Sequence, residues 1–171
     1  IGETLMLGRL EHFNALAEAE ALVELLAVCA SKVWARTLLD QRPFNNQAAL
    51  LAASAAAWQL TCEADWLEAF DGHPKIGDTQ ALQGGPQTTA MQEQGQVKAA
   101  LASTRQALAR LNQAYLAQFG FIFIICASGQ SAEAMLTVLE QSLNQSRADE
   151  LQRAASEQFK ILTGRLKAWF E

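Results

Sequence analysis

The chain has 171 residues and a formal net charge of −5, and half of its residues are hydrophobic. Alanine, leucine, glutamine and glutamate dominate, and with three prolines and few β-branched residues this composition disfavours strand-rich folds. The scattered lysines and arginines form no stripe for nucleic acid and no polybasic segment for a membrane. We therefore predict an all-α, single-domain helical bundle over residues 1–171, with about seven to nine helices.

Other features of the sequence predict a cytoplasmic protein. No run of residues approaches the roughly 18 apolar positions that a membrane span needs, and the first residues carry no signal-peptide pattern. Cys29, Cys62 and Cys126 lie far apart, without the spacing of a disulfide framework or a zinc site. We interpret all three cysteines as reduced residues of the core.

The first third of the chain predicts three helices. Apolar residues recur every three or four positions from Leu10 to Ala30, and Asn14 breaks this pattern near its start. Residues 32–40 predict a second helix, which Arg42-Pro43 ends. The third helix covers residues 47–60 and follows a pair of asparagines that can cap it. This helix is rich in alanine, which is predicted to let Leu51, Ala55 and Trp58 face a neighbour at close range.

A short helix over residues 61–70 leads into the sequence WLEAFDGHPKIGD, residues 66–78. His73 stands just past this helix, and Pro74 biases it towards an extended conformation on a stiff loop. A histidine can exchange protons near neutral pH. Two interpretations of His73 therefore stay open: an acid or base in a pocket, or a turn residue that caps the helix. His12, on a polar helix start, is interpreted as a solvated surface residue.

The second half of the chain predicts three further helices. The first runs from about Thr88 to Gln118. Its predicted buried stripe comprises Leu101, Leu108, Leu111 and Tyr115. Ser131 caps a helix that reaches Leu143, and Ser146 caps the last helix, which reaches about Phe170. The predicted stripe of the last helix comprises Leu151, Ala155, Leu162 and Leu166, with Arg165 at its margin.

Between these helices lies the run FGFIFIICASGQS, residues 119–131. Its residues 121–127 are too few for a membrane span and too uniformly apolar for an exposed segment. We predict an extended or irregular passage through the core. The buried backbone groups of this passage need hydrogen-bond partners. A polar ligand could supply them, and a strand-like connector without ligand contact is the alternative.

The inventory of reactive residues excludes several types of site. His12 and His73 are far apart and neither has a close pair of carboxylates, which disfavours a multi-histidine metal site. The sequence contains no phosphate-binding glycine loop and no G-x-S-x-G elbow. We predict that the protein uses no metal and no organic cofactor.

Five motifs together resemble the 2-oxo-4-hydroxy-4-carboxy-5-ureidoimidazoline (OHCU) decarboxylases of the urate-to-allantoin pathway. They are RPF at 42–44, DWLEAFDGHPKIGD at 65–78, EQG at 93–95, LNQAYLAQFGFIFIICASGQSAEAML at 111–136 and KILTGRL at 160–166. The resemblance covers nearly the whole chain. The HP-x-IGD loop together with FGF-x-F and the closing RL is far more specific than any single motif.

The resemblance implies an all-helical carboxy-lyase of purine catabolism that needs no cofactor and is generally a homodimer. Its partner would be the small-molecule substrate OHCU, decarboxylated to (S)-allantoin and CO2, and not a nucleic acid or a membrane. The resemblance further implies that His73 is the catalytic acid/base. It makes Glu93 a polar partner at the substrate and Arg165 the cation near the substrate's charge.

The resemblance also implies a set of substrate-binding positions. They are Pro74, Ala90, Met91, Gln92, Glu93, Gln94, Phe123, Ile124, Ile125, Cys126 and Ala127. Where the family usually has a serine three positions before the glutamate, this chain has Ala90, with hydroxyls at Thr88 and Thr89. The alternative from another functional class is a helical small-ligand-binding or protein-interaction module without catalysis.

Overall fold

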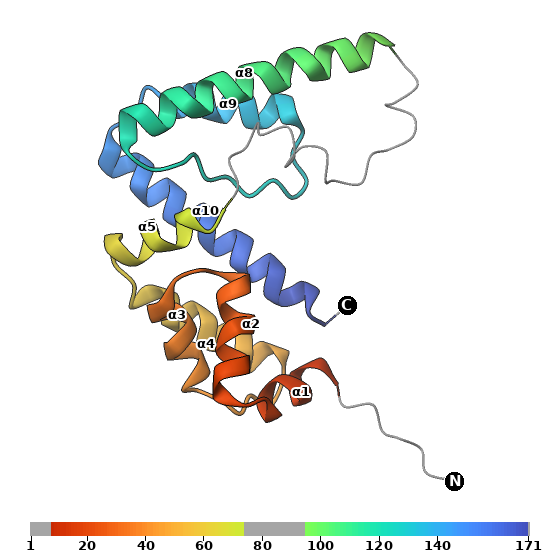
Figure 1. Ribbon diagram of the computed structural model, residues 1–171, viewed down its shortest axis with the longest axis vertical. Helices are drawn as coiled ribbons and strands as arrows, with labels where there is room; N and C mark the ends of the chain where they lie inside the picture. Colours follow the sequence, from red (N-terminus) through yellow and green to blue (C-terminus); the bar gives the residue numbers. More distant parts are fainter. Residues whose placement is uncertain (1–7, 74–94, 171) are drawn as a thin grey trace. The chain divides into compact units, whose positions relative to one another are not determined.

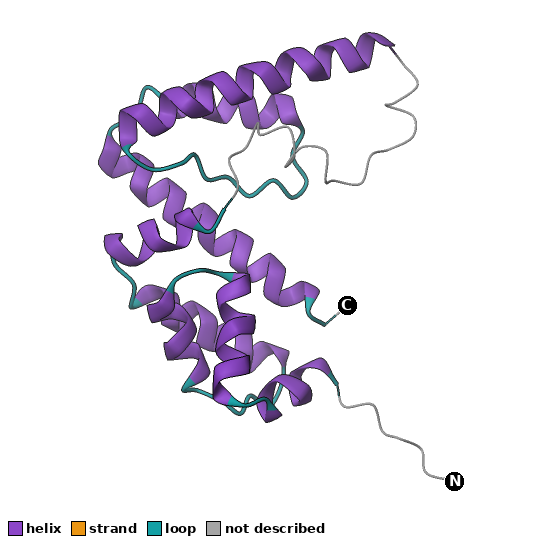
Figure 2. Cartoon of the chain, viewed as in Figure 1, coloured by secondary structure: helices purple, strands orange, loops and turns teal. Residues whose placement is uncertain are grey.

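The computed structural model describes residues 8–73 and 95–170, with side chains from residue 101 onwards in the second stretch. Within these residues the chain forms eight helices and no strand (Figure 2). This confirms the predicted all-α fold. It agrees with a composition in which helix-forming residues dominate.

The contacts between residues group the chain into two compact units. The first unit runs to Gly72 and takes in the chain from Phe159 onwards, and the second is His73–Gln158. The helices of the first unit are α1 (Arg9–Ala15), α2 (Glu18–Val28), α3 (Lys32–Leu39), α4 (Gln47–Gln59) and α5 (Glu63–Asp71). The second unit contains α8 (Gly95–Phe119) and α9 (Ala132–Ser142), and α10 (Arg147–Ala168) contributes residues to both (Figure 1). The single domain stays a prediction.

In the first unit α3 packs against α2, α4 and α5. Ser31 caps α3, since its Oγ accepts a hydrogen bond from the backbone N–H of Trp34 at 3.2 Å. The Trp34 indole is fully buried, and its Nε1 donates to Ser54 Oγ at 3.1 Å, so its polar atom has a partner inside the core. Each leucine or phenylalanine buried around it contributes about 1.5–3 kcal/mol.

The helix predicted from Leu10 to Ala30 is two helices, and the break lies at Leu16 and Ala17 instead of Asn14. Arg42 explains the position of the break. Its Nη1 donates to the backbone carbonyls of Phe13 and Leu16, at 2.8 and 2.9 Å. These carbonyls at the end of α1 are thereby satisfied without another helical turn.

The other helices of this unit begin and end within two residues of the prediction. Of the three α4 residues predicted to face a neighbour, Leu51 and Trp58 pack against the core, although the fully buried positions are others. The buried residues of α4 are Leu50, Ser54 and Ala57, each one position before a predicted one. Leu51, Ala55 and Trp58 are half-buried. The predicted cap is confirmed, because Asn46 Oδ1 accepts from the backbone N–H of Ala49 at 2.8 Å.

In the second unit α8 packs along α9 (Figure 1). Leu108 and Tyr115 of the predicted α8 stripe are fully buried, and Leu101 and Leu111 are half-buried. The serine caps of α9 and α10 are both present. All four predicted stripe residues of α10 are buried. Thr88 and the rest of the predicted start of the long helix, up to residue 94, lie outside the described residues.

Residues 122–127 form neither helix nor strand, as predicted for this apolar segment. Phe123, Ile124 and Ile125 are each at most 3 % exposed, so the segment passes through the core of the second unit. Gly120 and Gly129 stand on either side of it with φ of +83° and +75°. Residues with a side chain rarely adopt this conformation. The two glycines therefore allow the sharp changes of direction into and out of the segment.

Candidate functional site

His73 is the second residue after α5 and is half-buried. Its Nε2 lies 2.6 Å from Oε1 of Gln158, a residue of α10 that is fully buried. An amide oxygen only accepts hydrogen bonds, so Nε2 carries the proton. The lone pair of the neutral imidazole then lies on Nδ1, which is the nitrogen able to accept a proton.

Gly72 places His73 at the end of α5. A Cβ at position 72 would lie 2.8 Å from the Cβ of Ala30, closer than real Cβ contacts come. Any larger residue there would push α5 away from Ala30. The glycine before the histidine is therefore required by the packing within the first unit.

Gln158 is a partner of His73 that the sequence did not predict. It lies on the buried stripe of α10, between Ala155 and Leu162, where the helical period calls for an apolar side chain. A glutamine at such a position needs a buried hydrogen-bond partner. That rule, applied to α10, would have pointed to a polar contact in the core.

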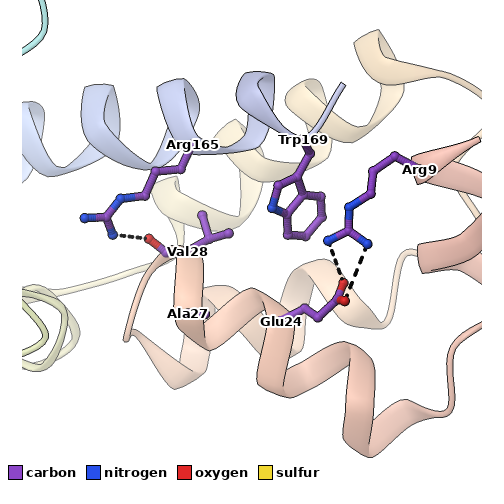
Figure 3. A pocket seen from close by; sticks show the side chains of 6 residues that line it. All are labelled: Arg9, Glu24, Ala27, Val28, Arg165 and Trp169. Atoms are coloured by element: carbon purple, nitrogen blue, oxygen red, sulfur yellow. Dashed lines mark hydrogen bonds and ion pairs between the residues drawn. The ribbon is translucent and has the colours of Figure 1, made fainter. Parts of the chain in front are cut away.

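Arg165 belongs to the first unit, where its Nη1 donates to the backbone carbonyl of Val28 at 2.8 Å (Figure 3). The side chain lines a cavity of about 300 Å³. The other lining residues are Arg9, Glu24, Ala27, Val28 and Trp169. Val28 is the last residue of α2. The guanidinium of Arg165 is therefore held by the backbone of a helix that is far away in the sequence.

The opposite wall of this cavity also carries charge. Arg9 pairs with Glu24, at 3.0 Å between Nη2 and Oε2, and its guanidinium lies 4.5 Å from the centre of the Trp169 ring (Figure 3). With Arg165 the lining therefore holds two positive charges and one negative charge. An excess positive charge beside an aromatic face suits a small anionic, planar group.

Cys29 is the residue after Val28 and is buried. Burial raises the pKa of its thiol from 9.0 to about 11, although a backbone hydrogen bond with Ser31 and the charge of Arg165 act in the opposite direction. The thiol therefore stays protonated and unreactive at neutral pH. Cys62 is exposed just before α5, so the prediction that all three cysteines are core residues is wrong for Cys62. Cys126 is half-buried.

Because Cys29 is buried and Cys62 is exposed, the two thiols should differ in their reactivity towards an alkylating reagent. In the folded protein at pH 8, iodoacetamide should alkylate Cys62 while Cys29 stays unmodified, and peptide mass spectrometry should show the two extents. Because the folded thiol titrates at about pH 11 and the unfolded one near 9, the stabilisation from protonated Cys29 is complete below pH 9 and is lost as the pH rises towards 11. Equal labelling of Cys29 and Cys62 at pH 8 would contradict the burial of Cys29.

The remaining predicted site residues divide into two groups. Pro74, Ala90, Met91, Gln92, Glu93 and Gln94 lie outside the described residues. Phe123, Ile124 and Ile125 are buried in the second unit, Cys126 is half-buried and Ala127 is exposed. Two carbonyls of this segment bond to side chains of the same unit, Ile124 to Arg153 and Cys126 to Gln130, each at 2.8 Å. His12, predicted to be a surface residue, is exposed.

Among residues 8–73 and 95–170, no group of three or more histidine, cysteine, aspartate or glutamate side chains could hold a metal ion. None of the helices in the described part of the chain is both long and apolar enough to cross a bilayer.

Comparison with known proteins gives consistent matches. The family profile described as OHCU decarboxylase matches residues 14–167. The chain is 36 % identical over 145 residues to the uric acid degradation bifunctional protein TTL of Arabidopsis thaliana, covering 83 % of this chain and 45 % of that protein. It is 24 % identical over 131 residues to the OHCU decarboxylase of Haloferax volcanii, covering 77 % of each chain. The chain thus spans less than half of the Arabidopsis protein.

Solved structures with the same fold are also known. A crystal structure of an OHCU decarboxylase in the presence of (S)-allantoin aligns with a TM-score of 0.71 and 34 % sequence identity, covering 86 % of this chain and 96 % of that one. A crystal structure of (S)-allantoin synthase aligns with a TM-score of 0.65, covering 94 % of this chain and 54 % of that one. At 20 % identity this second likeness concerns the fold alone.

Proposed function

The chain belongs to the OHCU decarboxylase family, and on this premise we propose that it converts OHCU to (S)-allantoin and CO2. The observation that carries the proposal is the family match over residues 14–167, a range that includes His73, Glu93 and Arg165. The crystal structure of the relative in the presence of (S)-allantoin supports the identity of the product. The protein would accordingly act as a carboxy-lyase in the degradation of urate.

The chemistry of the substrate explains why few catalytic groups would suffice. In OHCU one ring carbon carries both the hydroxyl and the carboxylate. When the bond to the carboxylate breaks, CO2 leaves and the electron pair passes into the unsaturated ring. The hydroxyl loses its proton and becomes a carbonyl, and the neighbouring ring carbon gains a proton. The ring nitrogen that receives the electron pair takes up one proton from solvent, which balances the negative charge of the carboxylate. The ring itself holds the electrons, so the protein has to orient the substrate and move one proton.

His73 is the residue that we propose for this proton transfer. Its neutral imidazole accepts the proton of the substrate hydroxyl, and the imidazolium returns a proton to one face of the ring. The hydrogen bond between Nε2 and Gln158 supports this role, because it directs the basic lone pair to Nδ1 and limits rotation of the ring. Delivery to one face accounts for a single enantiomer of allantoin.

Glu93 and Arg165 complete the proposed catalytic set. Glu93 would orient the substrate or the imidazole by hydrogen bonding. Arg165 would neutralise negative charge on the substrate, which agrees with the excess positive charge around its cavity. Pro74, the positions 90–94 and the segment 123–127 would contact the substrate, with backbone N–H groups that stabilise charge on a ring carbonyl.

The remaining parts of the proposal concern assembly, location and cofactors. We propose a homodimer in the cytoplasm that works without metal or organic cofactor. Three free cysteines are compatible with a reducing compartment. The mass of the protein in solution, measured by light scattering, tests the dimer.

One experiment tests the function directly. Freshly prepared urate-oxidation product should decay faster when the protein is added, and circular dichroism should show (S)-allantoin as the only enantiomer. Exhaustive dialysis against a chelator should leave the rate unchanged. A rate equal to the uncatalysed one would refute the proposal. Binding of (S)-allantoin without acceleration would favour the non-catalytic ligand-binding alternative.

A further inference from the structure

The backbone at Ile124 is held by a side chain from another helix. Because residues 122–127 form no helix or strand, their buried polar groups need other partners. Ile124 is 2 % exposed, and its carbonyl accepts a hydrogen bond from Nη1 of Arg153 on α10 at 2.8 Å. The guanidinium also lies 4.7 Å from the centre of the Phe123 ring. Arg153 therefore contacts both the backbone and a side chain of the segment.

Arg153 is itself fixed by a buried network. Its Nε donates to Oε1 of Glu150 at 2.9 Å, and the same oxygen accepts from the hydroxyl of Tyr115 at 2.7 Å. Glu150 is 1 % exposed and Tyr115 is fully buried. Burial, together with the bond to Glu150, raises the pKa of the Tyr115 phenol above its ordinary value, so the hydroxyl remains a donor. The planar guanidinium is thus fixed in orientation as well as position.

This network is costly for the fold. The Glu150 carboxylate loses its hydration while the Arg153 side chain stays 24 % exposed, and apolar residues in place of a buried ion pair often leave stability unchanged or improve it. In addition, Nη2 of Arg153 is buried without a hydrogen-bond partner among the described residues, which adds a further cost. A gain in stability is therefore a poor explanation of the network. A precisely held backbone at Ile124 is a better one.

We propose that Arg153 is a positioning residue, which fixes the backbone of residues 123–127 through the Ile124 carbonyl and the Phe123 ring and is itself oriented by Glu150 and Tyr115. This inference rests on the proposed function, in which the same segment contacts the substrate. Arg153 acts on the reaction only through that segment. Glu150 and the hydroxyl of Tyr115 act through Arg153, whereas the Tyr115 ring itself lies 5.3 Å from the Phe123 ring and is kept in Tyr115→Phe.

The chain offers a matched control in Arg147. It also belongs to α10, its Nε donates to the carbonyl of Phe119 at 3.2 Å, and its guanidinium lies 5.6 Å from the Phe121 ring. Both arginines thus donate to a backbone carbonyl and lie near a phenylalanine ring, but these two contacts of Arg147 lie outside residues 123–127. Arg147 is exposed and Arg153 is half-buried and paired with Glu150, so the two replacements will differ in their effect on stability. The comparison therefore concerns the activity of the folded protein, which a positioning role lowers in the Arg153 variant alone.

The experiment compares Arg153→Met with Arg147→Met in the decarboxylation assay, with rates corrected for the folded fraction. Since a 1 Å misplacement costs on the order of 10²-fold, a smaller shift at Ile124 should lower kcat/KM about tenfold in Arg153→Met, and Arg147→Met should stay within about twofold of wild type. Arg153→Lys keeps the charge and one donor, so it should fold and lose less. Tyr115→Phe should lower kcat/KM in the wild-type background but have no further effect beside Arg153→Met.

Amide hydrogen exchange provides a second measurement that does not depend on activity. Exchange at residues 123–127 should be faster in Arg153→Met and Arg153→Lys than in wild type, and unchanged in Arg147→Met. Equal losses of kcat/KM in the two methionine variants, or unchanged exchange at residues 123–127, would overturn the positioning role. If wild type does not decarboxylate OHCU, the proposed function fails on its own, and the exchange rates still decide the role of Arg153.

Discussion

Replacing His73 by asparagine should lower turnover by about 10²–10⁴-fold, the contribution of a positioned acid or base. Asparagine keeps a polar side chain that fits within the space of the imidazole but cannot take up a proton near neutral pH. Binding of (S)-allantoin, measured by calorimetry, should therefore change far less than kcat. Arg165→Lys and Glu93→Gln should each cost less than His73→Asn, because lysine keeps the positive charge, glutamine keeps a hydrogen-bonding group, and both leave proton transfer in place.

The chain's other histidine supplies the control for this experiment. His12 is exposed, so His12→Asn makes the same chemical change away from the proposed site and should leave kcat unaltered. Near-normal turnover to a single enantiomer in His73→Asn would show that the proton comes from another group. Glu93 would then be the next candidate.

Replacing Gln158 by leucine should reduce kcat by about 10²-fold, since a small misplacement of a reacting group can cost that much. Leucine is apolar and of similar volume, so it fits the stripe of α10 but removes the acceptor for Nε2 of His73. The imidazole can then rotate and adopt the other tautomer. Steady-state kinetics should show the loss in kcat, and the melting temperature should change little.

Gln158→Glu separates orientation from packing. A carboxylate still accepts from Nε2, so turnover should recover in part relative to the leucine variant. The carboxylate also favours the imidazolium form. Because the proposed mechanism starts from neutral His73, the acidic limb of the pH–rate profile should move to higher pH. If Gln158→Leu melts at a lower temperature but keeps its kcat, Gln158 serves packing alone.

Local patterns in the sequence were sufficient for most helices but not for two details of the fold. α1 ends at Ala15 because Arg42, more than twenty-five positions away, takes the carbonyls of Phe13 and Leu16. No residue near the end of α1 indicates this contact in the sequence. In α4 the many alanines give several faces nearly the same hydrophobicity, so periodicity alone could not decide between Leu50 and Leu51.

Some residues of the candidate site could likewise be predicted from the sequence, and others could not. His73 stood out because a lone histidine before a proline is unusual in a helical chain, and Arg165 entered through the family motif. Gln158 and Arg153 went unnoticed, since their roles depend on partners that only the fold supplies. The irregular segment was predicted from its apolar run, but the identity of its hydrogen-bond partners could not be predicted from local sequence.

The tryptophans and the tyrosine lie in different units, so the unfolding of each unit can be followed by its own spectroscopic signal. The chain has four tryptophans, Trp34, Trp58, Trp66 and Trp169, and all belong to the first unit. Its single tyrosine, Tyr115, belongs to the second. Indole fluorescence therefore follows the melting of one unit, and the ultraviolet absorbance of phenolate in alkaline solution follows the opening of the other. Without any added dye, the natural chromophores can show whether the two units unfold together or in sequence.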